Sequence, residues 1–431
     1  MVDCGGFMKF YLCMAGAFFL ALAAFAETLP MEEGGAPDAP ASRSMAAFAV
    51  ATRQTPTLDF AHKTPPGKIF FCSAKRAYRG EDITVVAFLL NAVRGGRYDA
   101  RYSFKLVSPS GREDFFAKDL RVSGKAVPGN AVVWLKPSAT IIFDGSDRLG
   151  AYRLVLEVEN LLTGERAAKE CAIELAAWDA AGISPISGAG EFNNALRGYF
   201  KYCSPSALYA LYSSPEAKIY DGGRLNETLY IFFREAFRAK PFLADFIAEK
   251  FDTDADFSRK NTMIILSALG MADKLRGKPM TDAEKQFSSQ IFQMLYSTVS
   301  PYEKGGLKIS QDSLWGEFYA KGNYAPVERV LAFLKNEEAA KALMAGIKGG
   351  GDFKNIDPAK LRAGMAFISA AFSLMRNSNI ELARNYMAFY MAQNKDKLTP
   401  EKLNAAFGLV REYLDSRRAA QDSATAANSK K

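Results

Sequence analysis

Apolar and polar residues alternate along much of the chain between residues 67 and 178. In residues 102–106 and 152–158 almost every second side chain is apolar, and the side chains between them are mostly polar or charged. A period of two gives a strand one buried and one solvated face, which is typical of antiparallel sheets. Together with turns such as Arg94-Gly95-Gly96, spaced roughly every 8–15 residues, the pattern predicts a β-sandwich. Further strands are expected at residues 69–72, 83–90, 113–117, 131–135, 140–143 and 170–175.

The apolar spacing changes to a helical period over residues 187–415. Ser204-Pro205, Asp357-Pro358 and Thr399-Pro400 each place a capping side chain before a proline, and this pair marks a helix start. Residues 281–284 read Thr-Asp-Ala-Glu, which is a capping box. We expect about ten to twelve helices, stacked as a helical-hairpin bundle or as an irregular α-solenoid. The predicted fold class is therefore multidomain, all-β followed by all-α.

Residues 1–26 have the pattern of a signal peptide. Met8-Lys9 precedes an apolar run, and Ala24-Phe25-Ala26 supplies the small residues that a signal peptidase reads. We expect translation from Met8, cleavage between Ala26 and Glu27, and a periplasmic or secreted protein without an integral membrane segment after cleavage. The alternative is an uncleaved anchor, although the run is shorter than the roughly 20 residues of a spanning helix.

Two ranges have a composition that argues against folding. Gly34-Gly35-Ala36-Pro37 and Pro65-Pro66 punctuate residues 27–66, where little apolar surface is on hand to offset the entropy of ordering. We expect residues 27–66 to be a disordered linker and residues 416–431 to be a disordered tail. A short strand or helix near residues 45–50 is an open alternative.

Charge and histidine content exclude several kinds of function. The formal net charge of +8 comes without any run of five like charges, so the basic residues indicate a solvated surface and no nucleic-acid partner. The single histidine, His62, lies in the expected linker, outside both predicted domains. Because histidine is the usual general base and the commonest metal ligand, we expect no histidine-based triad, no cofactor and no bound metal.

Paired carboxylates are the catalytic route that remains, because a glycosidase needs two acids and no histidine. The candidates by residue type are Glu191, Glu227, Glu235 and Glu317. Each is more simply explained as a solvated helix residue. The catalytic residues therefore stay unknown at this level.

Three other patterns have simple structural explanations. Asp252-Thr-Asp-Ala-Asp256 begins like a calcium loop, but Phe257 and Met263 replace the turn glycine and the closing glutamate. Gly349-Gly350-Gly351 precedes no Lys-Ser or Lys-Thr pair, which a phosphate loop requires. The aromatic side chains between residues 199 and 212 have helical spacing. We expect an acidic loop before a helix, a connector and a set of core residues.

Residues 149–158, followed by Leu162-Thr163-Gly164-Glu165, resemble the last hairpin of bacterial immunoglobulin-like domains, with a Gly-x-Tyr entry and a Thr-Gly turn. The resemblance implies an immunoglobulin-like β-sandwich over residues 67–178 and no particular function. The first and last strands of such sandwiches commonly lie side by side. A disulfide between Cys72 and Cys171 is therefore expected, while the state of Cys203 stays open.

The stretch Leu314-Trp-Gly-Glu-Phe-Tyr-Ala-Lys-Gly-Asn323 resembles a helical segment of uncharacterised bacterial exported proteins that carry a Leu-Trp-x-x-Phe-x-Ala-x-Gly pattern. No activity is implied by that group. Trp315 and Phe318 lie three residues apart and are expected on one helix face, and Gly322 is expected to end the helix.

These observations favour an exported bacterial envelope protein that is not an enzyme. In this hypothesis the protein is a binding or scaffold protein, and its helical domain binds a protein or a glycan of the cell envelope. The alternative is a carboxylate-dependent hydrolase of cell-wall or other polysaccharide, which predicts two acids in one cleft, one of them with a raised pKa. A structural subunit is the third hypothesis.

Overall fold

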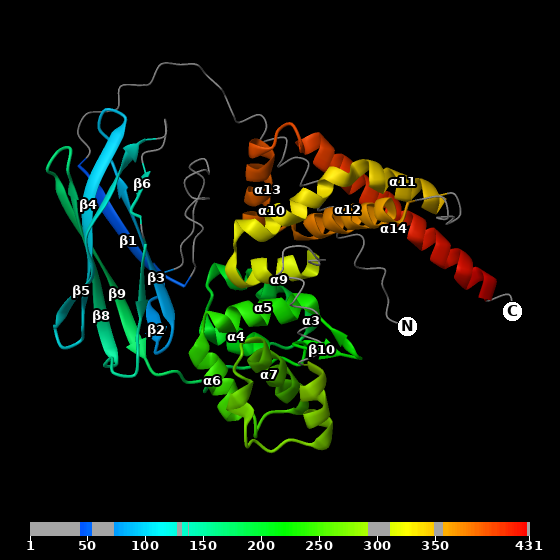
Figure 1. The fold of residues 1–431 in the computed structure, drawn as a ribbon, viewed down its shortest axis with the longest axis horizontal. Coiled ribbons are helices and arrows are strands. Elements are labelled where there is room, and N and C mark those ends of the chain that lie inside the picture. The colour runs from blue at the N-terminus through cyan, green and yellow to red at the C-terminus, as the bar shows by residue number, and fades with distance from the viewer. Residues whose placement is uncertain are drawn as a thin grey trace.

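The computed structural model describes residues 44–53, 73–126, 132–136, 138–291, 311–348 and 357–428, with side chains to residue 419. Within these ranges a β-rich region precedes a helical region, and the two lie side by side (Figure 1). The order all-β then all-α is therefore confirmed. The exception is a short hairpin within the helical region, formed by β10 (Tyr220–Asp221) and β11 (Arg224–Leu225).

The β region contains two sheets. The larger sheet has the order β2 (Arg76–Tyr78), β9 (Arg166–Ala176), β8 (Gly150–Asn160), β4 (Arg97–Val107) and β5 (Glu113–Lys125). Its neighbours are antiparallel except β2 and β9, which are parallel. In the smaller sheet β3 (Asp82–Leu90) pairs antiparallel with β1 (Ala46–Thr52), β6 (Val132–Trp134) and β7 (Ala139–Ile142).

Both sheets contribute side chains to one core. Leu89 comes from the smaller sheet, and Phe104, Leu154 and Ile173 come from the larger sheet, and all four are fully buried. Along β8, Tyr152, Leu154, Leu156 and Val158 are buried and Arg153 and Glu157 are exposed, although Val155 between them is buried as well. The period of two in the sequence therefore reports the burial of one strand face.

The structure differs from the sequence prediction at both ends of the described chain. Residues 46–52 lie in the expected linker, yet they form β1, because alternate alanines of this strand enter the core beside β3. The alternative of a short strand near residues 45–50 is thus the one that the structure has. Helix α14 (Pro400–Asn428) extends into residues 416–431, the expected disordered tail, since this alanine- and arginine-rich segment contains no glycine or proline.

The helical region has two halves with α9 (Gln311–Lys321) between them, as Figure 1 shows. The first half contains α3 (Ala189–Gly198), α4 (Pro205–Tyr212), α5 (Glu227–Arg238), α6 (Pro241–Lys250) and α7 (Asp256–Ala268), and residues 282–291 are also helical. The second half contains α10 (Tyr324–Ala332), α11 (Glu337–Lys348), α12 (Pro358–Asn377), α13 (Glu381–Gln393) and α14.

The helix starts follow the capping signals of the sequence. Ser204 accepts a hydrogen bond from the Ala207 amide, and Asp357 accepts one from the Ala359 amide at 2.8 Å. In the capping box, Glu284 Oε2 accepts from the Thr281 amide at 2.8 Å and Thr281 Oγ1 accepts from the Glu284 amide at 3.2 Å. These predictions are confirmed because a cap involves only neighbouring residues.

Helices α5 and α9 approach each other closely at a glycine. A Cβ atom on Gly316 would lie 2.4 Å from the carbonyl oxygen of Thr228 and 3.1 Å from the Ile231 Cβ. Gly322, with φ +69°, ends α9 as expected. Trp315 and Phe318 are both buried and in ring contact at 5.4 Å, which confirms that they share one face of the helix.

The β region and the helical region contact each other through aromatic residues, and a buried ion pair lies within the β region. Trp178, just after β9, packs against Tyr78 of β2 and Phe242 of α6 with ring centroids 5.1 and 5.6 Å apart. Glu81 is buried in an ion pair with Arg53, with Nε and Oε1 2.7 Å apart. Among the described residues, no helix is both long enough and apolar enough to cross a bilayer.

Candidate functional site

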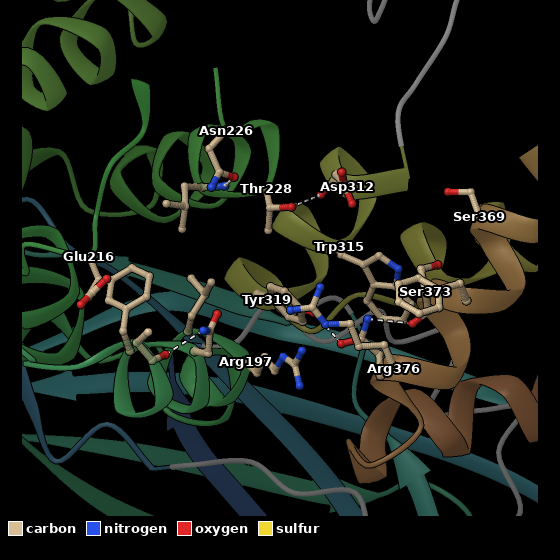
Figure 2. A pocket seen from close by; sticks show the side chains of 17 residues that line it. Arg197, Glu216, Asn226, Thr228, Asp312, Trp315, Tyr319, Ser369, Ser373 and Arg376 are labelled. Atoms are coloured by element: carbon tan, nitrogen blue, oxygen red, sulfur yellow. Dashed lines mark hydrogen bonds between the residues drawn. The ribbon is translucent and has the colours of Figure 1, made fainter. Parts of the chain in front are cut away.

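A cavity of about 380 Å³ opens where the two halves of the helical region meet (Figure 2). Its walls come from α3, the first turn of α5, α9 and α12, so both halves contribute to it. The side chains used below are Arg197, Glu216, Asp312, Trp315, Tyr319 and Arg376. A volume of this size is in the range of small-molecule sites.

Two aromatic residues of α9 line the cavity. Trp315 and Tyr319 are 4% and 5% exposed, and their rings stack with centroids 6.1 Å apart. The Tyr319 hydroxyl donates to Asn377 Oδ1 at 2.5 Å, and Asn377 Nδ2 donates to the Ser373 carbonyl at 2.9 Å. Burial raises the pKa of Tyr319, so its hydroxyl stays protonated at neutral pH. This wall is therefore held in place by packing and by hydrogen bonds to α12.

The indole nitrogen of Trp315 is a donor without an acceptor. Its Nε1 is buried at the cavity and has no hydrogen-bond partner among the described residues. Buried indole N–H groups usually have a partner, because an unsatisfied buried donor costs free energy. A ligand atom that accepts this hydrogen bond would remove that cost.

Two arginines from different helices converge on Tyr319. Arg197 lies on α3 and Arg376 on α12, and Figure 2 shows both near the Tyr319 side chain. Their charges lower the pKa of Tyr319 slightly against the larger effect of burial. Neither guanidinium has a carboxylate within ion-pair distance in the part of the chain that the structure describes.

Carboxylates gather on the other side of the cavity. A second cavity of about 460 Å³ shares Glu216, Asn226 and Asp312 with the first and adds Glu227, and its lining also includes Lys218 and Arg224. Desolvation raises the pKa of Asp312, the charge of Glu227 raises it further, and Arg376 opposes both. Glu227 Oε2 accepts a hydrogen bond from Ser313 Oγ at 2.9 Å.

The four glutamates suggested by the sequence do not converge. Of the four, Glu227 lines one of the two cavities described above, and Glu191 is exposed in the first turn of α3. Glu235 is buried in an ion-pair cluster, with Oε2 2.6 Å from Lys321 Nζ and Oε1 2.7 Å from Arg234 Nη2. Glu317 lies 3.8 Å from the same lysine.

The electrostatics of Glu235 argue against a role as a general acid. Burial raises its pKa, but the hydrogen bond from Lys321 and the charges of Arg234 and Arg238 outweigh burial and lower it. A carboxylate held in its charged form by three cations has no proton to donate. Its role is structural.

The other sequence patterns are structural as well. Asp254 accepts a hydrogen bond from Ser258 Oγ, and Asp256 begins α7, as expected for an acidic loop before a helix. In the aromatic cluster, Tyr199, Phe200 and Tyr212 are core residues, whereas Tyr202 is exposed. Within the described ranges, no group of three His, Cys, Asp or Glu side chains could hold a metal ion.

Several predicted features fall outside the described residues. These are the signal peptide with its cleavage site at Ala26 and Glu27, His62, Cys72 and the glycines 349–351. Cys171 lies on β9 and packs, half-buried, against the core of the β region. Since Cys72 lies outside those ranges, the disulfide stays a prediction. Cys203 is buried in the helical core, and its Sγ donates a weak hydrogen bond to the Phe200 carbonyl.

Sequence reasoning missed Arg197, Asp312 and Arg376. They lie far apart in the chain and meet only through the packing of α3, α9 and α12. No local spacing signals such a group. The one clue was the Leu-Trp-x-x-Phe-x-Ala-x-Gly stretch, since it contains Trp315.

Comparisons with known proteins do not assign a family. No family model matches the chain, and no curated protein matches it. A family 123 glycoside hydrolase from Clostridium perfringens, studied for glycolipid glycan hydrolysis, aligns at a TM-score of 0.21 and 8% identity. That alignment covers 45% of this chain and 36% of the hydrolase chain.

A second solved structure is α2-macroglobulin from Escherichia coli, from domain MG7 to the C-terminus. It aligns at a TM-score of 0.16 and 12% identity, over 86% of this chain and 66% of that chain. At such TM-scores neither alignment establishes a shared fold.

Proposed function

We propose that the chain is a non-catalytic binding protein of a bacterial envelope, and that its ligand occupies the cavity between the two helical halves. The observation that carries this proposal is the unpaired Trp315 Nε1 beside Arg197 and Arg376. Three donors that face one cavity without carboxylate partners form a recognition site for a polar ligand.

The chemistry of the cavity favours binding over turnover. No histidine or cysteine is among the residues that line it in the described structure, and Ser373 Oγ donates to the Ala370 carbonyl. An activated nucleophile needs a base within hydrogen-bond reach. The lining instead offers hydrogen-bond donors beside the aromatic side chains of Trp315 and Tyr319.

In this proposal the remaining parts of the chain direct export and position the helical region. Residues 1–26 direct export, with cleavage between Ala26 and Glu27. The β region is an immunoglobulin-like sandwich that acts as a spacer before the helical region. The ligand comes from the envelope, where proteins and glycans both expose polar groups.

The fluorescence of Trp315 provides a test. Soluble fragments of bacterial cell wall are titrated into the purified chain, and tryptophan emission is recorded. We expect a saturable change that is lost in Trp315→Phe. Trp178→Phe is the matched control, because Trp178 Nε1 is also buried without a partner but lies at the contact between the β region and the helical region.

Two outcomes would contradict binding without catalysis. The first is the absence of any saturable change with wall fragments and with extracts of envelope protein. The second is the steady release of products from wall material at catalytic amounts of the chain.

A specific observation supports the hydrolase as a second candidate. Asp312 has a raised pKa and lies beside Glu227, as expected for a carboxylate pair in which one partner donates a proton. In that case Asp312→Asn and Glu227→Gln abolish the release of soluble sugar from wall polysaccharide. Glu191→Gln, outside the cavity, is the matched control. Release that survives both cavity substitutions would exclude this candidate.

A further inference from the structure

The charged groups of the site are separated along α9. Asp312, Trp315 and Tyr319 follow one another at intervals of three and four residues, so they lie on one face of the helix, and all three line the cavity. Asp312 is at the start of this face, whereas both arginines meet Tyr319 at its other end. The site therefore has an acidic end and a basic end.

Asp312 marks the acidic end of this face. Figure 2 shows Glu216, which follows α4 and lines both cavities, well apart from Asp312, so Glu216 is not part of that end. Asp312 has no cation within ion-pair distance among the described residues.

The charges select against two classes of ligand. A neutral sugar would leave two guanidinium groups and the Asp312 carboxylate without partners in a partly enclosed space, and unpaired desolvated charges are costly. A polyanion would satisfy the arginines but would face repulsion from Asp312. A ligand that carries one charge of each sign satisfies both ends.

The distance between the two ends sets the length of that ligand. Seven residues separate Asp312 from Tyr319, and at about 1.5 Å per residue the two positions are roughly 10 Å apart along the axis. An extended peptide spans roughly 3.3 Å per residue, so three residues cover this distance. The ammonium and carboxylate of a single amino acid are too close together to reach both ends.

We infer that the cavity binds a short zwitterionic peptide of about three residues. Its C-terminal carboxylate accepts hydrogen bonds from Arg197, Arg376 and Trp315 Nε1, and its N-terminal ammonium donates to Asp312. Guanidinium groups bind a carboxylate through two parallel hydrogen bonds, which fixes the direction of the peptide. This inference rests on the proposed binding function and specifies its ligand.

Calorimetric titration of the full chain with trialanine tests the inference. We expect saturable binding of trialanine and binding at least tenfold weaker for free alanine, for N-acetyl-trialanine and for trialanine amide. Trialanine is the probe because its methyl side chains fit any cavity that admits the backbone.

Substitutions assign the two ends. Arg376→Gln should weaken trialanine binding at least tenfold but should leave the weak binding of trialanine amide unchanged, because the amide has no carboxylate to lose. Asp312→Asn should weaken trialanine binding at least tenfold but should leave the weak binding of N-acetyl-trialanine unchanged, because the acetylated peptide has no ammonium group. Arg384→Gln, on α13 and exposed outside the cavity, is the matched control and should bind like the parent chain. Circular dichroism confirms that each variant is folded.

The outcomes separate this inference from the proposed function. A saturable fluorescence change with wall fragments, but equal binding of trialanine and its two capped forms, would overturn the peptide assignment and leave the binding function standing. Saturation by a neutral oligosaccharide alone would do the same. No response to trialanine or to wall fragments would overturn both proposals.

Discussion

The β region and the helical region place their charged residues differently. In the β region the described ion pairs lie mostly on exposed strand faces, for example between Arg101 and Glu159 and between Arg121 and Asp99. In the helical region Glu235 is 3% exposed and is surrounded by Arg234, Arg238 and Lys321. The β region has one buried pair, between Glu81 and Arg53, whereas the helical region surrounds a buried glutamate with three cations.

This difference is in keeping with our proposal that the helical region carries the binding site. Strand alternation places most charged residues of the β region on its solvated faces, and the buried pair of Glu81 and Arg53 is the exception. In the helical region buried charges need partners at defined positions, and such groups cost free energy unless the surrounding structure supplies those partners. The cavity charges of Arg197, Arg376 and Asp312 belong to the same region, and in our proposal the ligand is their partner.

The largest expected effect on stability comes from Glu235. Glu235→Gln removes the charge that pairs with Arg234 and Lys321 and leaves the buried Arg234 without its carboxylate, so the free energy of unfolding should fall by about 3 kcal/mol. Urea unfolding followed by circular dichroism measures the loss. Glu159→Gln, the matched change in the β region, should leave the unfolding midpoint nearly unchanged because Glu159 pairs with exposed arginines. Equal losses for the two variants would contradict the comparison.

Acid should reveal a second buried ion pair of the helical region. The hydrogen bond from Arg259 is the main cause that lowers the pKa of Glu284 from 4.5 to about 2. Because the folded-state pKa is depressed, this stabilisation is present above pH 4.5 and is lost as the pH falls toward 2. It amounts to roughly 3 kcal/mol for a shift of this size.

Unfolding of Glu284→Gln across this range of pH measures the contribution. The variant should be less stable than the parent chain at neutral pH, and the difference should shrink toward pH 2, where the parent glutamate is itself protonated. A difference that stays constant with pH would show that the ion pair contributes no pH-linked stability.

A smaller effect is expected where α5 and α9 touch. Gly316→Ala places a Cβ atom against the Thr228 carbonyl, and the helices must separate, so the free energy of unfolding should fall by about 2–3 kcal/mol. Gly408→Ala, in α14 with open space around its Cα, is the matched control and should stabilise the chain by about 0.5–1 kcal/mol. Thermal unfolding of the two variants should therefore shift in opposite directions. Two shifts of the same sign would exclude this explanation.

The features that the sequence predicts correctly are local. The alternation in β8 and the caps at Ser204 and Thr281 depend on residues close to one another in the chain, and periodicity reports such contacts directly. Strand β1 was less visible, because its inward residues are alanines and give a weak apolar signal. The tail was misjudged because helix propensity outweighed its polar composition.

The residues of the site are far apart in the sequence, so no local pattern predicts that they meet. Nothing near Arg197 or Arg376 in the sequence distinguishes them from the other arginines of the chain. They meet because α3 and α12 both pack against α9, which carries Tyr319. Gly316 likewise has no special neighbours in the sequence. A side chain at position 316 is excluded by the Thr228 carbonyl, which α5 brings within contact distance.

Helix α9 joins two tasks that proteins usually assign to separate elements. Through Gly316 it fixes the first half of the helical region, and through Trp315 and Tyr319 it forms a wall of the cavity that α12 completes. A ligand in this cavity would contact both halves of the helical region, and its dissociation would remove those contacts. In the proposed complex, the two halves of the helical region should therefore move less relative to each other when the cavity is occupied than when it is empty.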